Sequence, residues 1–180
     1  MPAGRRGPAA EDEGRDSAAR DDVPRSGGGG HVLTLGILAL TAAALFTGAA
    51  FYISFAEHPA RSRLDDRAQL QQWGPAYARG AQMQASLAVI GFVLGLATWW
   101  QTRDELWIVG AIVLVANWPY TMLMIMPVNR ELKAIPLDDA GEESSALLQR
   151  WGRLHARRTM LGAVATLLMF WAAVVPAHAS

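Results

Sequence analysis

The side chains best suited to catalysis or ligand binding come directly before the last apolar stretch of the chain. Trp151, His155 and Arg158 are spaced by four and three residues, so they share one face of a helix with Leu148. A second face carries only arginines: Arg150, Arg153 and Arg157. If the arginine face meets water or headgroups, the first face points into the molecule. Ionisable residues at the edge of a membrane are candidates for function. The alternative is that Arg158 snorkels to the interface and His155 only caps a carbonyl.

A second group of polar residues ends the first apolar stretch, in the string SFAEHPA. Ser54 and His58 are four residues apart and so share a helix face, with Glu57 beside them. Pro59 is predicted to end the helix, because proline disfavours helical geometry in the residue before it. A purely structural alternative is that His58 offsets the negative end of the helix dipole.

A third group ends the third apolar stretch, where Asn129 and Arg130 follow Pro127. Deeper in the same stretch, Asn117 is predicted to satisfy a carbonyl that Pro119 leaves unpaired. A weaker signal precedes the second apolar stretch, where Trp73, Tyr77 and Arg79 could form a lid or an interfacial helix.

Four uncharged, mostly apolar runs must position these residues: 32–55, 80–102, 106–128 and 159–177. Crossing the ~30 Å of hydrocarbon in a bilayer takes about 20 helical residues. None of the runs shows the polar stripe of a buried helix in a soluble bundle. Hydrophobic residues make up 52% of the chain and charged residues only 18%. The sequence therefore predicts an all-α fold, a four-helix transmembrane bundle over residues 31–180, with the lipid bilayer as its partner.

Residues 1–30 have a different composition from the rest of the chain. They hold six acidic residues and five arginines, and Val23 is their only large aliphatic residue. Such a segment cannot bury enough apolar surface to offset chain entropy, so it is predicted to be a disordered tail with a glycine hinge. The formal net charge of the whole chain is zero, which gives no support to a nucleic-acid partner. The chain has no cysteine, so disulfides and thiolate chemistry are excluded.

The lengths of the connections predict where the polar groups meet. Residues 101–105 allow only a tight hairpin, so the long connections 56–79 and 129–158 lie on the same side of the membrane. The candidate site residues then converge at one mouth of the bundle: Glu57, His58, Arg79, Asn129, Arg130, Trp151, His155 and Arg158. That side has ten Lys and Arg residues, against about three near the span ends on the other side. The positive-inside rule thus predicts a multi-pass cell-membrane protein with its long connections in the cytoplasm and both termini outside.

Three strings of this sequence resemble the anthrone-oxygenase-like family of small four-helix integral membrane proteins, most of them classed as a domain of unknown function. They are SFAEHPA after the first run, MPVNREL after the third, and RWGRLHARRTM before the fourth. The matching positions are His58, Pro59, Pro127, Asn129, Leu132, Trp151, His155 and Arg158. The resemblance covers about residues 32–175.

The resemblance implies oxidation of a flat, hydrophobic aromatic small molecule of the anthrone type, with molecular oxygen as co-substrate and no organic cofactor. Under this hypothesis His155 is the base, because imidazole has an ordinary pKa of about 6.5, and His58 is the rival base. Arg158 and Asn129 would hold the enolate oxygen. Trp151 would stack on the rings, and Arg130, Glu57 and Arg79 would complete the substrate site.

Two other functions stay open at this point. The first is a metal-dependent membrane oxidase, with Fe or Cu on His58, His155 and Glu57. The second is a binding or structural bundle without catalysis. The sequence also leaves open a homo-oligomer. Channels and proton relays are disfavoured, because the four runs lack repeated polar residues and mid-span carboxylates.

Overall fold

The computed structural model describes residues 27–175. The first helix begins at Gly27, within the glycine run that was predicted as a hinge. The rest of the predicted tail, residues 1–26, and the last two residues of the fourth predicted span lie outside the described residues.

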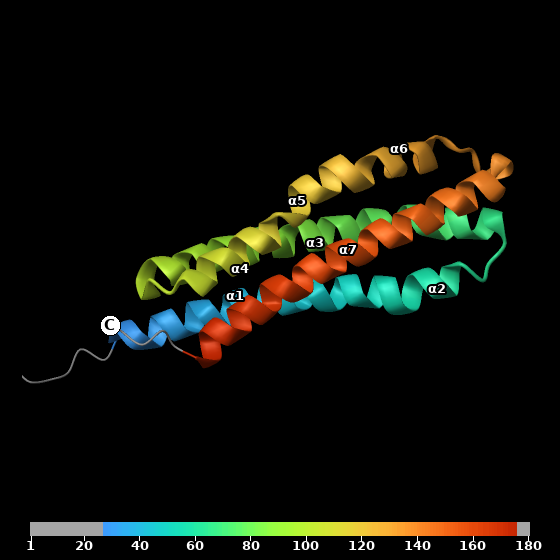
Figure 1. The fold of residues 1–180 in the computed structure, drawn as a ribbon. Coiled ribbons are helices and arrows are strands. Elements are labelled where there is room, and N and C mark those ends of the chain that lie inside the picture. The colour runs from blue at the N-terminus through green and yellow to red at the C-terminus, as the bar shows by residue number, and fades with distance from the viewer. Residues whose placement is uncertain (1–26, 176–180) are drawn as a thin grey trace, which may run out of the picture.

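Four long rods build the described part of the chain, which contains no strand (Figure 1). We number these rods as membrane helices one to four. Helix one consists of α1 (Gly27–Tyr52), the π-helical segment η1 (Ile53–Glu57) and α2 (His58–Arg61), and helix two is α3 (Asp66–Thr102). Helix three consists of α4 (Glu105–Val115), α5 (Asn117–Tyr120), the π-helical segment η2 (Thr121–Ile125) and α6 (Met126–Ala134). Helix four is α7 (Glu142–Val174), preceded by the 3₁₀ turn η3 (Leu137–Asp139).

The rods run up and down, and each packs on its neighbours in the chain. α1 lies against α3 and α7, and α4 also lies against α3 and α7, so the four form a closed square. Figure 1 shows α2, α6 and the start of α7 at one end of the bundle, which we call the loop end. The turn between α3 and α4 and the end of α7 lie at the other, the hairpin end. All four rods are long and apolar enough to cross a membrane. The all-α, four-helix transmembrane prediction is thus confirmed.

The helices extend well beyond the apolar runs that revealed them. Most of the long connection 56–79 is helical, and the first loop is only residues 62–65. α3 has 37 residues, about 55 Å at 1.5 Å per residue, so it exceeds the ~30 Å of hydrocarbon. An uncharged run predicts which part of a helix can lie in lipid, but it does not predict the residue at which the helix ends. α7 likewise starts at Glu142, with Ser144 bonding back to Gly141 in the first turn.

The prediction that Pro59 ends the first helix is wrong. The rod continues through Pro59 to Arg61 because a π-helical turn, η1, comes directly before it. Proline clashes with the carbonyl four residues back in an α-helix, whereas π turns pair residues five apart. Helix three has the same arrangement, because η2 ends two residues before Pro127 as η1 ends two residues before Pro59.

Small residues bring helices two and three together. Gly91 and Gly95 are buried, and a Cβ at Gly91 would lie 2.5 Å from Leu114. Ala44 and Gly48 have the same four-residue spacing in helix one, but both are exposed on the outer face.

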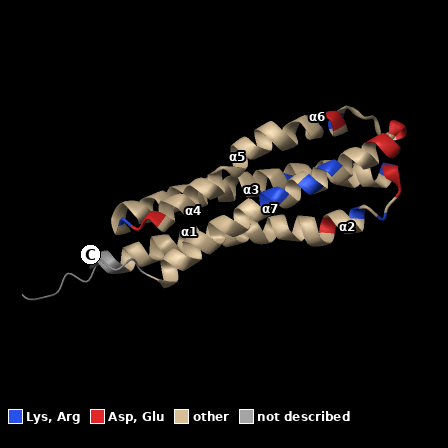
Figure 2. Ribbon diagram, in the orientation of Figure 1, with Lys and Arg blue, Asp and Glu red and all other residues tan. Residues whose placement is uncertain are grey.

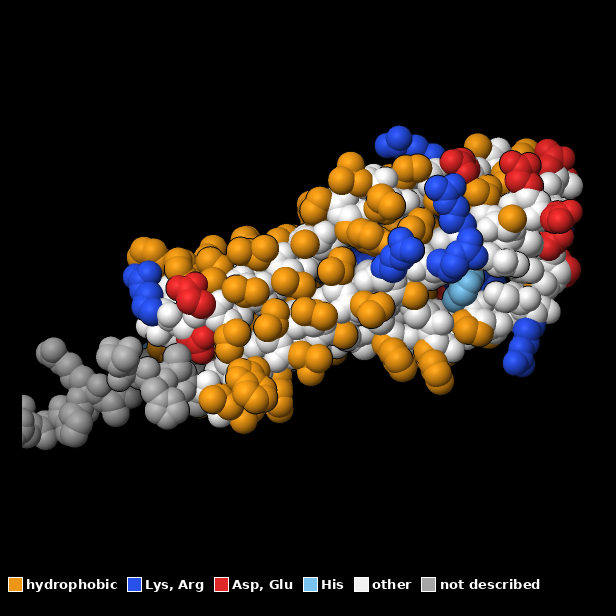
Figure 3. All heavy atoms as spheres, in the orientation of Figure 1, with side chains coloured by type: hydrophobic (Ala, Val, Ile, Leu, Met, Phe, Trp, Pro, Cys, Tyr) orange, Lys and Arg blue, Asp and Glu red, His pale blue; other side chains and the backbone are white. Residues whose placement is uncertain are grey.

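The surface is divided in the way a membrane requires. Charged residues gather at the loop end, with a smaller group at the hairpin (Figure 2). Apolar side chains cover the flank between the two ends (Figure 3). Large exposed hydrophobics there include Leu45, Val93, Leu123 and Phe170. In water such a surface would aggregate, whereas in a bilayer it is the expected contact with lipid.

Candidate functional site at the loop end

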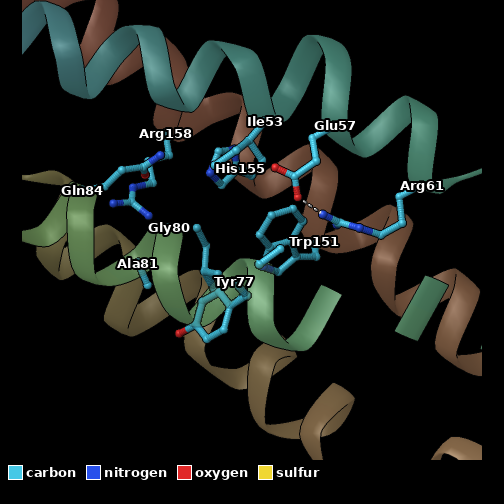
Figure 4. Close-up of a pocket in the computed structure, with 12 residues that line it drawn as sticks. Ile53, Glu57, Arg61, Tyr77, Gly80, Ala81, Gln84, Trp151, His155 and Arg158 are labelled. Carbon is cyan, nitrogen blue, oxygen red and sulfur yellow. Dashed lines mark hydrogen bonds and ion pairs between the residues drawn. The ribbon is translucent and has the colours of Figure 1, made fainter. Parts of the chain in front are cut away.

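A small polar cavity lies near the loop end, between two apolar clusters of the core. All four membrane helices line it (Figure 4). Helix one provides Ile53, Glu57 and Arg61; helix two Ala76, Tyr77, Gly80, Ala81 and Gln84; helix three Ile125; and helix four Trp151, His155 and Arg158. The cavity measures about 20 Å³, room for about one water molecule.

The two faces predicted for the start of helix four are confirmed. Trp151, His155 and Arg158 are buried on the inner face, together with Leu148. The arginines at 150, 153 and 157 are exposed on the outer face. A regular α-helix maintains this division, because spacings of three and four bring residues to one side.

His155 is held from two sides. Its ring stacks on Trp151, with the ring centroids 4.9 Å apart and the planes 23° apart. Its Nδ1 lies 3.1 Å from Ser54 Oγ, across the boundary between helices four and one. The side chain is 3% exposed. The imidazole is therefore fixed in orientation before any ligand arrives.

The hydrogen bonds around Ser54 assign the proton on His155. Thr159 Oγ1 lies 3.2 Å from the carbonyl oxygens of Ala50 and His155, and a carbonyl only accepts, so the Thr159 proton is used there. Ser54 must then donate to Thr159 Oγ1, at 3.0 Å. It follows that His155 Nδ1 donates to Ser54. This assignment satisfies every bond and leaves Nε2 as the acceptor nitrogen of the neutral ring.

Arg158 is a buried cation without a counter-ion. Its side chain is 7% exposed and forms no ion pair or hydrogen bond with any described residue. Its guanidinium carbon lies 5.2 Å from the centre of the Phe46 ring. Gln84 lines the same cavity, is 1% exposed, and has both side-chain polar atoms unpaired. Leaving buried polar groups unpaired costs free energy, so the hydrogen-bonding capacity of these two side chains is left unused in this structure.

The other buried arginine differs, because its charge is balanced. Arg61 pairs with Glu57 (Figure 4) and also donates to Gln72. Its guanidinium carbon lies 5.8 Å from the centre of the Trp151 ring. The cavity thus has one neutralised cation and one free cation, which favours an anionic or carbonyl oxygen near Arg158.

His58 lies beside the cavity and does not line it. Its ring packs on Gly152, where a Cβ would come within 2.1 Å of His58 Nε2. Its centroid is 6.0 Å from that of Trp151, and its Nδ1 is buried and unpaired. His58 therefore packs against Gly152 and near Trp151, outside the cavity.

The remaining predicted site residues lie elsewhere. Asn129 is buried, but its amide donates to Met126 Sδ at 3.6 Å, and it does not line the cavity. Arg79 and Arg130 are exposed and also outside the cavity wall. Asn117 donates to the Leu114 carbonyl at 3.1 Å, so it bonds within its own helix.

Sequence reasoning missed three residues that the structure brings to the cavity. Arg61 was counted only as a topological charge, although its spacing from Glu57 is that of an i, i+4 ion pair. Gln84 is neutral, so it did not interrupt an uncharged run. Tyr77 was noted only as part of a weak lid signal, and it lines the wall.

In the described part of the chain, no three His, Asp or Glu side chains gather closely enough to hold a metal ion. Glu57 is engaged by Arg61, and His155 Nδ1 by Ser54. The donor set suggested for Fe or Cu is therefore not assembled in this arrangement.

One comparison with known proteins bears on this site. The family model described as anthrone oxygenase matches residues 73–168, slightly more than half of the 180 residues. The match runs from Trp73 through helix three to Leu168, and so includes His155, Arg158 and Gln84. No curated protein and no solved structure matches the chain. The chain belongs to the anthrone oxygenase family.

Proposed function

We propose that this protein oxidises a flat, hydrophobic, anthrone-like substrate with molecular oxygen and without an organic cofactor. The observation that carries the proposal is the pairing of an oriented neutral imidazole, His155, with an unpaired buried guanidinium, Arg158, on one helix face. A base and an oxyanion partner are the two groups that this chemistry requires.

The first step is removal of a proton from the methylene carbon of the substrate. His155 Nε2 accepts this proton, and the electron pair of the C–H bond moves to the carbonyl oxygen. The product is an enolate whose central ring is aromatic. Arg158 faces the negative oxygen, and Gln84 offers a further amide donor in the same cavity. Burial strengthens both contacts, because little water competes for the charge.

The second step oxidises this carbon. The enolate carbon bonds to O2, two electrons pass to oxygen, and the proton held by His155 completes a hydroperoxide. Loss of the remaining C–H proton and of hydroxide then gives the ketone and one water. In sum, a CH2 group and O2 become a C=O group and H2O. His155 returns to its starting state without net proton release.

Trp151 does not stack on the substrate rings in this proposal, which is the role that the family resemblance implied. Its ring already stacks on His155, has the Arg61 guanidinium carbon 5.8 Å from its centre, and meets Trp73 edge-on at 6.4 Å. With 4% of its surface exposed, it offers no free face to a substrate. We assign it as a positioning residue that fixes the His155 ring.

Oxygen uptake by the purified protein with an anthrone tests the proposal. His155→Gln should lower kcat by about a hundredfold or more, because general-base catalysis contributes roughly 10²–10⁴. His58→Gln is the matched control and should retain most of the rate, since His58 does not line the cavity. Equal oxygen uptake by wild type and His155→Gln would overturn the role of His155 in favour of another base, and uptake no faster than without protein would favour a non-catalytic bundle. Loss with His58→Gln alone would transfer the role to His58.

A further inference from the structure

A second cavity opens on the flank of the bundle between helices two and three. It measures about 170 Å³, and Ala85, Trp118, Met122 and Met126 form much of its apolar wall. Trp118 is 42% and Met122 57% exposed, so the mouth opens on the surface that faces lipid. We call this cavity the flank groove.

The flank groove adjoins the polar cavity. Tyr77, Ala81 and Arg158 line both. The inner end of an apolar groove is thus an unpaired buried guanidinium. The groove also contains a second unpaired group, the hydroxyl of Thr121, which is buried without a hydrogen-bond partner. Its walls suit a ring system, and both polar groups suit oxygen atoms on that ring system.

The sizes of the two cavities assign them different occupants. About 20 Å³ in the polar cavity admits one small molecule, whereas about 170 Å³ in the groove admits much of a fused ring system. A hydrophobic ring compound also concentrates in the hydrocarbon of the bilayer, since apolar surface leaves water. The groove mouth is on that side.

We propose that the flank groove is a binding site for a flat aromatic ligand that arrives from the membrane and bears a phenolic or enolate oxygen. The rings lie between helices two and three, and the oxygen points inward to Arg158. That this ligand is then oxidised rests on the proposed function above, whereas its binding does not.

A non-reactive ligand tests the binding site directly. The probe is 1,8-dihydroxyanthraquinone, titrated by its fluorescence into the full-length protein in lipid nanodiscs. Ala85 lines the groove and not the polar cavity, so Ala85→Phe adds its bulk to the groove. It should weaken binding by about tenfold or more, equivalent to about 1.4 kcal/mol. The matched control, Ala78→Phe, places the same side chain on the same helix at an exposed position outside both cavities, and should remain within about twofold.

A second variant keeps the test informative if Ala85→Phe fails to fold. Thr121→Val preserves shape and removes the unpaired hydroxyl, so it should selectively weaken the dihydroxy probe relative to unsubstituted anthraquinone. Wild-type-like binding by Ala85→Phe, or equal losses in Ala85→Phe and Ala78→Phe, would overturn the inference. So would absence of probe binding to the wild type, as expected if an acyl chain fills the groove. Binding that Ala85→Phe blocks, in a protein that takes up no oxygen, would refute the proposed function and support the groove. Oxygen uptake that Ala85→Phe leaves unchanged would support the proposed function and refute the groove as its substrate site.

Discussion

The Ser54 hydroxyl determines which ring nitrogen of His155 carries the proton. It accepts from His155 Nδ1 because its own proton is committed to Thr159. The lone pair on Nε2 is thus a consequence of two short hydroxyl side chains, one on each of two helices, and of the carbonyls that accept from Thr159. A base prepared in this way needs no carboxylate partner, and none contacts His155 among the described residues.

Removing this hydroxyl should act on turnover and hardly on substrate binding. Ser54→Ala frees the Nδ1 proton and the ring orientation, so we expect kcat to fall by about tenfold, the equivalent of one lost hydrogen bond, with KM nearly unchanged. Steady-state oxygen uptake measures both constants. Thr166→Ala is the control, because it removes a similar hydroxyl bridge between helices one and four, to Thr47 at 2.9 Å, away from the cavity. Equal effects of the two variants would show that Ser54 is only structural.

Gly152 is the residue that allows His58 to reach the bundle. A methyl group there would overlap His58 Nε2, so Gly152→Ala should lower the free energy of unfolding by about 1–3 kcal/mol. Thermal unfolding in detergent measures this loss. Gly48→Ala, with no atom within 4 Å of the added Cβ, should be neutral or stabilising. In a His58→Ala background the cost of Gly152→Ala should largely disappear. A cost that persists there would contradict the overlap.

At the scale of elements, the π segments decide which residues face inward. Ser54 and His58 would share a face in an α-helix, but Ser54 lies inside the η1 turn and His58 directly follows it. As a result Ser54 reaches His155 while His58 turns toward Gly152. Both π segments lie in the half of the bundle that holds the cavity, and such segments are frequent at functional sites.

Deleting one residue from η1 should therefore disrupt the site and preserve the bundle. Without Ala56, bonds between residues five apart become bonds between residues four apart, so the residues on either side of the turn keep their relative orientation while those inside it change direction. Ser54, which lies inside the turn, is then no longer directed at His155 Nδ1. We expect oxygen uptake to fall by about tenfold or more while the helical circular dichroism is unchanged, and Ala56→Leu, which preserves the length, to behave like wild type. A fully active deletion variant would show that this register is unimportant.

These elements also show where sequence reasoning works. Hydropathy located all four helices, because a bilayer imposes length and composition on each span separately. Spacing placed Trp151, His155 and Arg158 correctly, because helix four is regular there. It could not assign the surroundings of His58 or Asn129, since π turns in helices one and three change the register. Gln84 carries no charge and thus left no signal in the pattern.

At the scale of the molecule, the bundle is asymmetric between its ends. The cavity, both long connections and most charges lie at the loop end (Figures 1 and 2). The positive-inside rule predicts that this end faces the cytoplasm. A pocket whose walls come from all four helices also makes the site depend on the assembled bundle.

The absence of cysteine makes the orientation directly testable. Ser62→Cys places one thiol at the loop end, and Gln101→Cys places one at the hairpin end; both positions are exposed. A membrane-impermeant maleimide added to intact cells should label Gln101→Cys and spare Ser62→Cys until the cells are permeabilised. The reverse pattern would invert the orientation.

The rods are longer than the membrane is thick, and this ties the site to the lipid around it. Helices of 33 and 37 residues span about 50 and 55 Å, so the loop end projects from the ~30 Å of hydrocarbon. The mouth of the flank groove then lies close to the boundary between acyl chains and headgroups. Hydrophobic mismatch moves that boundary: long acyl chains submerge the mouth, and short ones bring headgroups to it. Delivery of an oil-soluble ligand should therefore become faster in thicker bilayers, which association rates in nanodiscs of graded chain length would measure.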